Sequence, residues 1–319
     1  MIKERAVAAA AALLVSAASP APAFELQFPL ACELGVDCWL QQLVDRDPGP
    51  DALDHACGPH AYDGHKGVDI RLADDAALGA EVAVLAPAAG TVIGVRDGVP
   101  DGEFPAGKDC GNGVAIDHGD GWRTQLCHLR NGSIAVEQGR EVQAGDVLGA
   151  VGLSGNTEFP HLHVTLRRGD AVVDPFDGRP ADAPCGAGGA SLWAPEAGLP
   201  DVPGGVHGLG LRAAPPEFEA ARAGLPQARV LPARGPSLVA WAMFHATEAG
   251  DRIEMSVSGP DGEVASREVI ADRPQAERFL TIGRRSPAEG WPPGRYEAFV
   301  RMERDGRVLG ERRIAAQVR

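Results

Sequence analysis

One stretch of the chain, residues 160–167, reads Pro-His-Leu-His-Val-Thr-Leu-Arg. Leucine and valine occupy positions 162, 164 and 166, whereas two histidines and a threonine occupy positions 161, 163 and 165. Successive side chains of a β-strand point to opposite faces, so this alternation predicts a strand with an apolar face and a polar face. The pattern therefore places two imidazoles side by side on the surface opposite the core.

Similar short segments surround this strand and predict a compact antiparallel β domain. The chain contains 41 Gly and 26 Pro in 319 residues, which favours many turns over long helices. Residues 82–85 and 91–95 flank a turn at 87–90 and predict a first hairpin, and residues 114–118 and 122–129 flank Gly119-Asp120-Gly121 and predict a second. The other strands expected in this region are Val68–Leu72 and Val147–Val151.

The chain divides into five segments by composition. We expect a signal peptide at residues 1–23, a loop-rich lead-in at 24–60, a β domain with a groove at 61–176, a linker at 177–205 and a second domain at 206–319. The linker holds 7 Gly and 5 Pro in 29 positions. In the last segment the expected strands are 238–244, 253–257, 263–270, 278–282, 296–302 and 307–318, which predict an immunoglobulin-like β-sandwich. The fold class is therefore all-β.

Two further predictions concern the lead-in. Residues Trp39–Val44 form a short helix candidate. The acidic side chains Asp45, Asp47, Asp51 and Asp54 could cover the groove of the following domain.

Charge is distributed unevenly along the chain. Residues 1–205 hold 13 basic and 29 acidic residues, whereas residues 206–319 hold 17 Arg against 15 Asp and Glu. An acidic front half would repel polyphosphate, so nucleic acid is not expected as a partner. After the N-terminal segment no apolar run is long enough for a membrane span, and the oligomeric state stays open.

The N-terminus and the cysteines indicate export. Lys3 and Arg5 precede an apolar stretch at 6–18 and a small-residue cleavage site at 21–23. Six cysteines in an exported chain indicate disulfides, for which 15 pairings are possible. Cys32 and Cys38 could close a small loop, and Cys110 and Cys127 could bridge the predicted hairpin, which leaves Cys57 with Cys185.

A candidate metal site follows from the histidine pattern. His65 and Asp69 are four residues apart and lie on one face of either an extended or a helical segment, while Gly67 between them disfavours a helix. Together with one histidine of the 161/163 pair they could supply two nitrogens and one carboxylate oxygen to a zinc ion. Three protein ligands leave a position for water, which is typical of catalytic zinc sites.

These residues resemble the lysostaphin-like, LytM-type zinc endopeptidases of bacterial cell walls. The resemblance covers about residues 60–176 and is carried by three motifs, His65-x3-Asp69, Leu126-Cys127-His128-Leu129 and Pro160-His161-Leu162-His163-Val164. Three flanking segments also resemble the corresponding segments of this family, namely Ala86–Val92, Gly111–Gly119 and Val142–Gly155.

The resemblance implies a role for each matched position. His65, Asp69 and His163 match the zinc ligands, and His128 and His161 match two non-ligand histidines that activate water and stabilise the tetrahedral intermediate. Leu126 stands where the family often has Tyr, and Tyr62 is only a loose match for a phenolic donor. The remaining histidines (55, 60, 118, 207 and 245) are expected to have no catalytic role.

The candidate metal site together with this resemblance implies a Zn2+-dependent endopeptidase that hydrolyses peptide bonds of peptidoglycan stems or cross-links through a metal-activated water, in the periplasm or outside the cell. Two alternatives stay open. The chain could be a non-catalytic activator or scaffold for another cell-wall hydrolase, or a metallopeptidase for a different substrate, since pocket loops rather than metal ligands set specificity.

Overall fold

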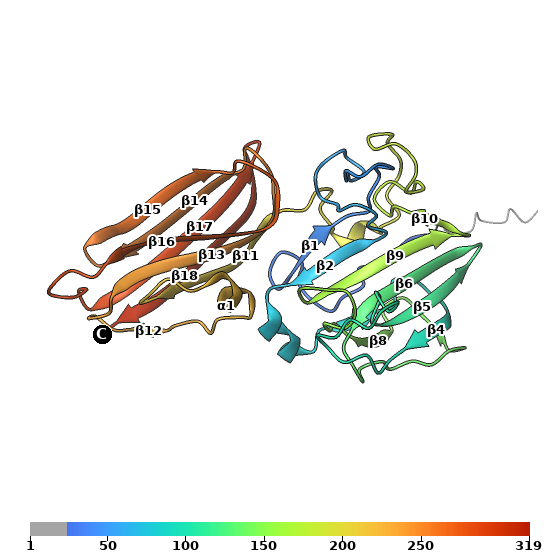
Figure 1. Ribbon diagram of the computed structural model, residues 1–319, viewed down its shortest axis with the longest axis horizontal. Coiled ribbons are helices and arrows are strands. Elements are labelled where there is room, and N and C mark those ends of the chain that lie inside the picture. The colour runs from blue at the N-terminus through green and yellow to red at the C-terminus, as the bar shows by residue number, and fades with distance from the viewer. Residues whose placement is uncertain (1–23) are drawn as a thin grey trace, which may run out of the picture.

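The computed structural model describes residues 24–319, so the expected signal peptide lies outside the described residues. Figure 1 shows two β-rich bodies side by side. We call residues 24–199 the N-terminal module and residues 205–319 the C-terminal sandwich. No helix among the described residues has the length and apolar character to cross a membrane.

One large sheet forms the frame of the N-terminal module. Its strands run in the order β1-β2-β9-β6-β5-β4-β7, and β10 pairs with β9. Their bounds are β1 Cys38–Gln42, β2 Val68–Leu72, β4 Gly90–Arg96, β5 Asn112–Gly119, β6 Trp122–Leu129, β7 Glu141–Val142, β9 His161–Arg168 and β10 Ala171–Val173. All neighbouring strands pair antiparallel. The expected antiparallel β architecture is confirmed.

The alternation in β9 has the predicted consequence. Leu162, Val164 and Leu166 are buried in the module's core together with Val68, Ile70 and Leu72 of β2. His161 and His163 therefore lie on the other face of the sheet, which we call the site face.

One predicted pairing is wrong. The segment around 82–85 does form a strand, β3 Ala83–Leu85, but it pairs with β8 Val147–Ala150 and not with β4. The turn between β3 and β4 carries the chain from this small two-stranded sheet into the large one, so local turn signals identified two strands but not their partners.

The lead-in also differs from the prediction. Residues 38–42 form strand β1, which pairs antiparallel with β2, and not a helix. Both faces of β1 are covered: Leu40 packs in the module's core, while the ring of Trp39 lies 6.0 Å from that of His207 and 6.2 Å from that of His245 in the sandwich. A strand that is buried on both faces has no alternating pattern, which explains the misassignment.

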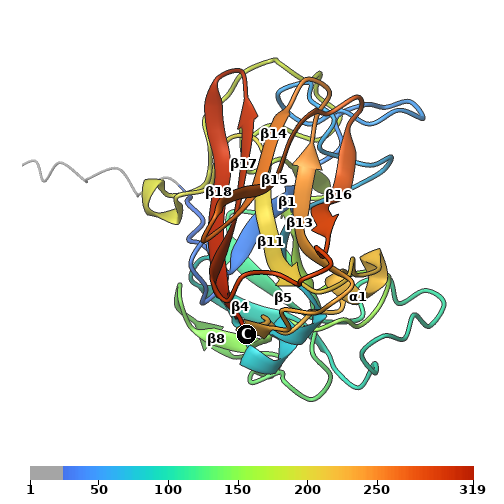
Figure 2. The same ribbon diagram turned by 90° about the vertical axis from the view of Figure 1, so that its left-hand side faces the viewer.

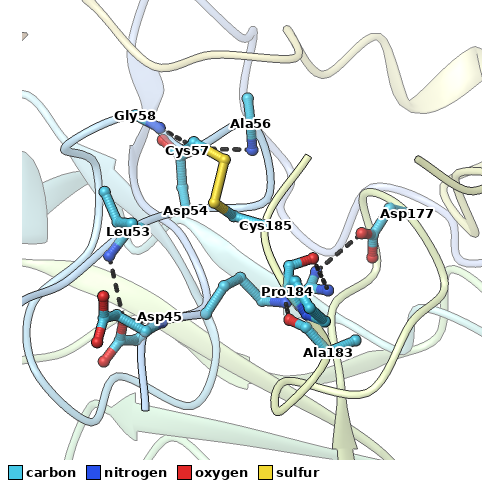
Figure 3. Close-up of a disulfide and its surroundings, with 12 residues drawn as sticks. Asp45, Leu53, Asp54, Ala56, Cys57, Gly58, Asp177, Ala183, Pro184 and Cys185 are labelled. Atoms are coloured by element: carbon cyan, nitrogen blue, oxygen red, sulfur yellow. Dashed lines mark hydrogen bonds and ion pairs between the residues drawn. A yellow bond between two sulfur atoms is a disulfide. The ribbon is translucent and has the colours of Figure 1, made fainter. Parts of the chain in front are cut away.

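Three disulfides join the cysteines, as Cys32–Cys38, Cys57–Cys185 and Cys110–Cys127. All three expected pairings are confirmed. Figure 3 shows Cys57–Cys185, which ties the lead-in to the segment after β10 across 128 residues. Beside it, Arg46 donates to the carboxylate of Asp177 (2.8 Å) and to the backbone carbonyl of Ala183 (3.1 Å). Disulfides of this kind are typical of extracytoplasmic proteins.

Two sheets enclose the core of the C-terminal sandwich. The first has the order β11-β13-β16 and the second β12-β18-β17-β14-β15. Bounds are β11 Gly205–Arg212, α1 Phe218–Arg222, β12 Val230–Leu231, β13 Ser237–Thr247, β14 Arg252–Gly259, β15 Gly262–Ile270, β16 Gln275–Arg285, β17 Gly294–Arg304 and β18 Arg307–Val318. The six expected strands are present, and β11 and β12 have no counterpart in the prediction. The immunoglobulin-like assignment stays a prediction.

The expected linker, residues 177–205, is partly structured and belongs in part to the N-terminal module. Trp193 and Ala197 belong to the module's core, and Leu26 pairs with Trp193 in a β-bridge. The bodies also contact each other directly: Gln41 donates to the Ala276 carbonyl (2.9 Å) and Arg312 to the Val36 carbonyl (2.7 Å). In Figure 2 the sandwich strands stand in front of the large sheet.

Candidate metal centre

Three adjacent strands, β2, β9 and β6, bring the candidate residues together. Asp69 of β2 lies opposite His163 of β9, and His163 lies opposite Cys127 of β6. His65 enters from the loop before β2. Asp69 and His163 therefore point from the site face at adjacent positions, and the chain that leads into β2 adds a third donor.

The three donor atoms form a tight triangle. His65 Nε2 lies 3.2 Å from Asp69 Oδ1 and 3.1 Å from His163 Nδ1, and His163 Nδ1 lies 2.8 Å from Asp69 Oδ1. Ligands about 2.0–2.1 Å from a tetrahedral zinc ion are themselves separated by about 3.3 Å. Two imidazoles and one carboxylate at this spacing fit a zinc ion that keeps an open coordination position.

Hydrogen bonds on the far side of each ring fix which nitrogen faces the centre. His65 Nδ1 donates to the Leu43 carbonyl (2.6 Å), so its Nε2 presents a lone pair to the other donors. His163 Nε2 lies 2.9 Å from Thr165 Oγ1, which leaves Nδ1 as the free donor atom. Such partners orient metal-binding histidines and maintain their tautomer. The lead-in thus supports the site through Leu43.

The glycine between the two motif residues allows this close approach. A Cβ atom at Gly67 would lie 2.6 Å from both His163 Nε2 and the Val164 carbonyl oxygen. Any side chain at this position would displace the His163 ring or the backbone of β9, so the His65-x-Gly-x-Asp69 loop requires glycine here.

His128 and His161 lie beside the triangle without joining it. Their ring centroids are 4.6 Å apart, and His161 Nε2 lies 3.6 Å from Asp69 Oδ1. His128 Nδ1 donates to the Ser154 carbonyl (2.8 Å) and His161 Nδ1 to the Phe159 carbonyl (2.9 Å). Each ring therefore keeps an unprotonated Nε2, the atom that can accept a proton.

A β-bulge directs His128 into the site. Gly113 pairs with Cys127 and Asn112 with Leu129, so His128 is the extra residue of β6. Its φ of 65° lies in the left-handed region, which is strained for a residue with a Cβ. In a regular strand Cys127 and His128 would face opposite sides, whereas here both line one groove. Strained backbone of this kind is found at functional sites.

Burial and charge set the protonation of the cluster. Burial, and after it the neighbouring His161, lowers the pKa of His128 to about 3. Burial also lowers the pKa of His161, although Asp69 opposes the shift. Burial acts to raise the pKa of Asp69, but the surrounding imidazoles of His65, His161 and His163 hold it well below its ordinary value. In His65, burial lowers the pKa, but Asp69, the Leu43 carbonyl and Asp45 together outweigh that effect, so the net shift is upward.

The groove over the site has a volume of about 350 Å³ and is lined by charged, polar and aromatic side chains. Tyr62 lines it and stacks on His65 with ring centroids 4.4 Å apart. Within the described residues, the groove lining includes none of the four acidic lead-in residues expected to cover it. Asp45 instead accepts backbone hydrogen bonds from Asp47, Leu53 and Gly64, so it holds the loop that carries His65.

All five candidate residues thus lie at one place, whereas the other histidines do not. His118 binds the Ala89 carbonyl and Thr124 away from the site, and His60, His207 and His245 lie at the contact between the two bodies. Sequence reasoning missed the supporting groups at Leu43, Ser154 and Thr165. Of these, Thr165 alone carried a signal, because it shares a strand face with both histidines.

The segment that contains this geometry has known relatives. Residues 63–175 match Peptidase family M23. The resemblance to lysostaphin-like peptidases is confirmed for this M23 segment, and the match supports a peptidase. It covers about a third of the chain and leaves the C-terminal sandwich outside.

The relatives of the M23 segment are short or distant matches. The cell division protein DipM of Caulobacter vibrioides is 38% identical over 64 residues, which is 20% of this chain and 10% of that protein. The chain thus spans about a tenth of the length of this curated relative. A zinc-containing peptidase from Vibrio cholerae is 23% identical, with coverage of 45% of this chain and 36% of that chain and a TM-score of 0.30. The catalytic domain of lysostaphin from Staphylococcus simulans is also 23% identical, with coverage of 35% and 77% and a TM-score of 0.29.

Proposed function

We propose that this chain is a zinc-dependent endopeptidase that hydrolyses peptide bonds of peptidoglycan in the periplasm or outside the cell. The observation that carries the proposal is the donor triangle of His65, Asp69 and His163 with two further imidazoles beside it. Family membership of the M23 segment supports the reaction class, and three disulfides support an oxidising compartment.

His65, Asp69 and His163 would hold the ion through Nε2, Oδ1 and Nδ1. When bound, zinc in such a site polarises a carbonyl group and makes a water molecule more acidic. His128 and His161 are neutral rings whose Nε2 atoms are unprotonated. One of them accepts a proton from the attacking water, and a protonated ring then donates to the leaving amine or to the tetrahedral oxyanion.

The charges of the side chains that line the groove indicate which class of peptide it would bind. Residues 63–175 contain 17 Asp and Glu against 9 Lys and Arg, yet the groove is lined by Lys66, Arg96 and Arg167 with a single carboxylate, Asp109. Arg96 and Arg167 donate to the backbone carbonyls of Gly111 and Asp170, so neither charge is neutralised by that bond.

These cations favour a peptide that carries free carboxylates, such as a peptidoglycan stem. Arg167 is four residues from His163 on the same face of β9, a distance of about 13 Å along an extended strand. A carboxylate two or three residues from the scissile bond could reach it. Local charge in the groove, and not the net charge of the module, then governs recognition.

The test is digestion of purified peptidoglycan followed by chromatography of the released fragments. We expect soluble peptides from the zinc-loaded protein and none after chelation or with His128→Ala, which should keep its metal. His163→Ala should lose the metal itself. Release of no fragments by zinc-loaded wild type, together with stimulation of a second hydrolase, would instead identify an activator.

A pair of synthetic stem peptides tests the substrate class. The free-acid peptide should be cleaved with a lower KM than the same peptide with amidated carboxylates. Equal KM values would show that Lys66, Arg96 and Arg167 do not recognise substrate charge.

A further inference from the structure

The loop before β9 controls how His161 is held. His161 Nδ1 donates to the carbonyl of Phe159 (2.9 Å) and lies 3.1 Å from Thr157 Oγ1. The Phe159 ring also stacks on the imidazole, with centroids 4.6 Å apart and planes inclined by 29°. The tautomer and the plane of His161 therefore depend on residues 157–159.

A buried arginine also lies against the Phe159 ring. The guanidinium carbon of Arg71 lies 4.9 Å from the ring centroid, within cation–π range. Arg71 belongs to β2 and lies opposite His161 in the strand register, on the site face. It is 1% exposed and donates to Gln41 Oε1 (3.0 Å) and to the Leu72 carbonyl (3.0 Å).

The charge that balances Arg71 comes from the C-terminal sandwich. Glu277 of β16 places Oε1 2.7 Å from Arg71 Nη1. Its Oε2 lies 3.7 Å from Arg222 Nε, and Arg222 of α1 donates from Nη2 to the backbone carbonyl of Glu158. Figure 1 shows α1 on the side of the sandwich that faces the N-terminal module. Two sandwich residues thus contact the loop that carries Phe159. Glu277 does so through Arg71, and Arg222 does so directly at the backbone of Glu158.

We propose that the C-terminal sandwich positions His161 for the proposed peptidase reaction, with Glu277 and Arg222 as positioning residues. Glu277 fixes Arg71 against Phe159, and Arg222 fixes the backbone at Glu158. Neither residue contacts the metal donors, so each acts through the orientation of the His161 ring. The inference rests on the proposed function, because it assigns His161 a catalytic task.

The size of the effect follows from the nature of these contacts. Loss of a group that orients a metal-binding side chain typically costs 10- to 100-fold, and a displacement of about 1 Å in an active site can cost 100-fold. The His161 ring keeps its own bond to the Phe159 carbonyl in the variants. We therefore expect Glu277→Gln and Arg222→Ala each to lower kcat about 10-fold, to change KM less than twofold, and to leave zinc content unchanged.

The chain offers a matched control at the same contact between the two bodies. Arg312 of β18 also donates from Nη2 to a backbone carbonyl of the module, that of Val36, and its guanidinium carbon lies 5.1 Å from the Trp39 ring centroid. It does not touch residues 157–161. Arg312→Ala removes an arginine that makes the same kind of contact between the two bodies as Arg222. Because this contact is not made to the loop before His161, kcat should stay within twofold of wild type.

Imidazole NMR of the full chain gives a readout that does not need turnover. The side-chain 15N–1H correlations of His161 should shift or broaden in Glu277→Gln and Arg222→Ala, and they should match wild type in Arg312→Ala. Unchanged His161 signals in both test variants would overturn the inference, as would an equal loss of kcat in all three. If wild type cleaves no peptide, the proposed function fails, and the NMR comparison still decides whether the sandwich orients His161.

Discussion

The hydroxyl of Thr165 supplies a sharp test of the candidate metal centre. Thr165 is 5% exposed, and its Oγ1 lies 2.9 Å from His163 Nε2. Thr165→Val replaces the hydroxyl with a methyl group of similar shape, so the Nε2–H of His163 loses its acceptor. An unsatisfied buried donor costs about 1–3 kcal/mol.

The His163 side chain is 14% exposed, so water can solvate part of this N–H, and the lower half of that range applies. A cost of about 1.4 kcal/mol corresponds to a tenfold change in an equilibrium constant, in line with the 10- to 100-fold loss of metal affinity when such partners are removed. We therefore expect the zinc dissociation constant to rise about tenfold in Thr165→Val.

The assay is competition for zinc against a chromophoric chelator of known affinity. Thr165→Ser keeps the acceptor oxygen and serves as the control, and its affinity should stay within about threefold of wild type. If Thr165→Val binds zinc as tightly as wild type while folded, His163 does not depend on this hydroxyl. If the serine variant loses as much affinity as the valine variant, packing and not the hydrogen bond is responsible.

Three further predictions concern strain, close packing and pH. His128→Gly should be about 1 kcal/mol more stable to urea than His128→Ala, because alanine retains the strain of the left-handed backbone; equal stability would argue against the bulge. Gly67→Ala should weaken zinc binding more than it lowers urea stability, since its Cβ would meet His163; unchanged affinity would refute this. Burial lowers the pKa of His207 and His245 well below 6.5, so the unfolded chain binds more protons as the pH falls below 6.5, and stability falls with it. His245→Gln should therefore reduce the stability lost between pH 7.5 and pH 5.5 by about 1.4 kcal/mol, and an unchanged loss would contradict the assignment.

The strands of the N-terminal module were predictable wherever one face is buried and the other is not. The alternation at residues 161–167 defines β9 and the common face of both histidines before any tertiary information is available. By contrast, Trp39 and Leu40 are buried on opposite faces of β1, one against the sandwich and one in the core. Their pattern therefore lacks the period of a strand, and by itself it favours a short helix.

Some groups of the candidate site could be predicted from the sequence and others could not. His65, Asp69 and His163 could be grouped from spacing and resemblance, because residue type and strand parity carry that information. The Leu43 and Ser154 carbonyls could not be found, since any residue supplies a backbone carbonyl and no side-chain pattern marks one. The left-handed conformation of His128 was equally hidden, because the bulge arises from how β5 and β6 pair.

The amino-acid sequence was sufficient to predict the all-β class, the donor set with the help of the family resemblance, and the short-range pairs Cys32–Cys38 and Cys110–Cys127, because these depend on local alternation, residue chemistry and short separations in the chain. Only the tertiary structure decided that β3 pairs with β8, that β1 is a strand, and that Glu277 and Arg222 reach the loop before His161. These contacts join residues far apart in the chain, and their energy comes from mutual burial, which no local pattern records.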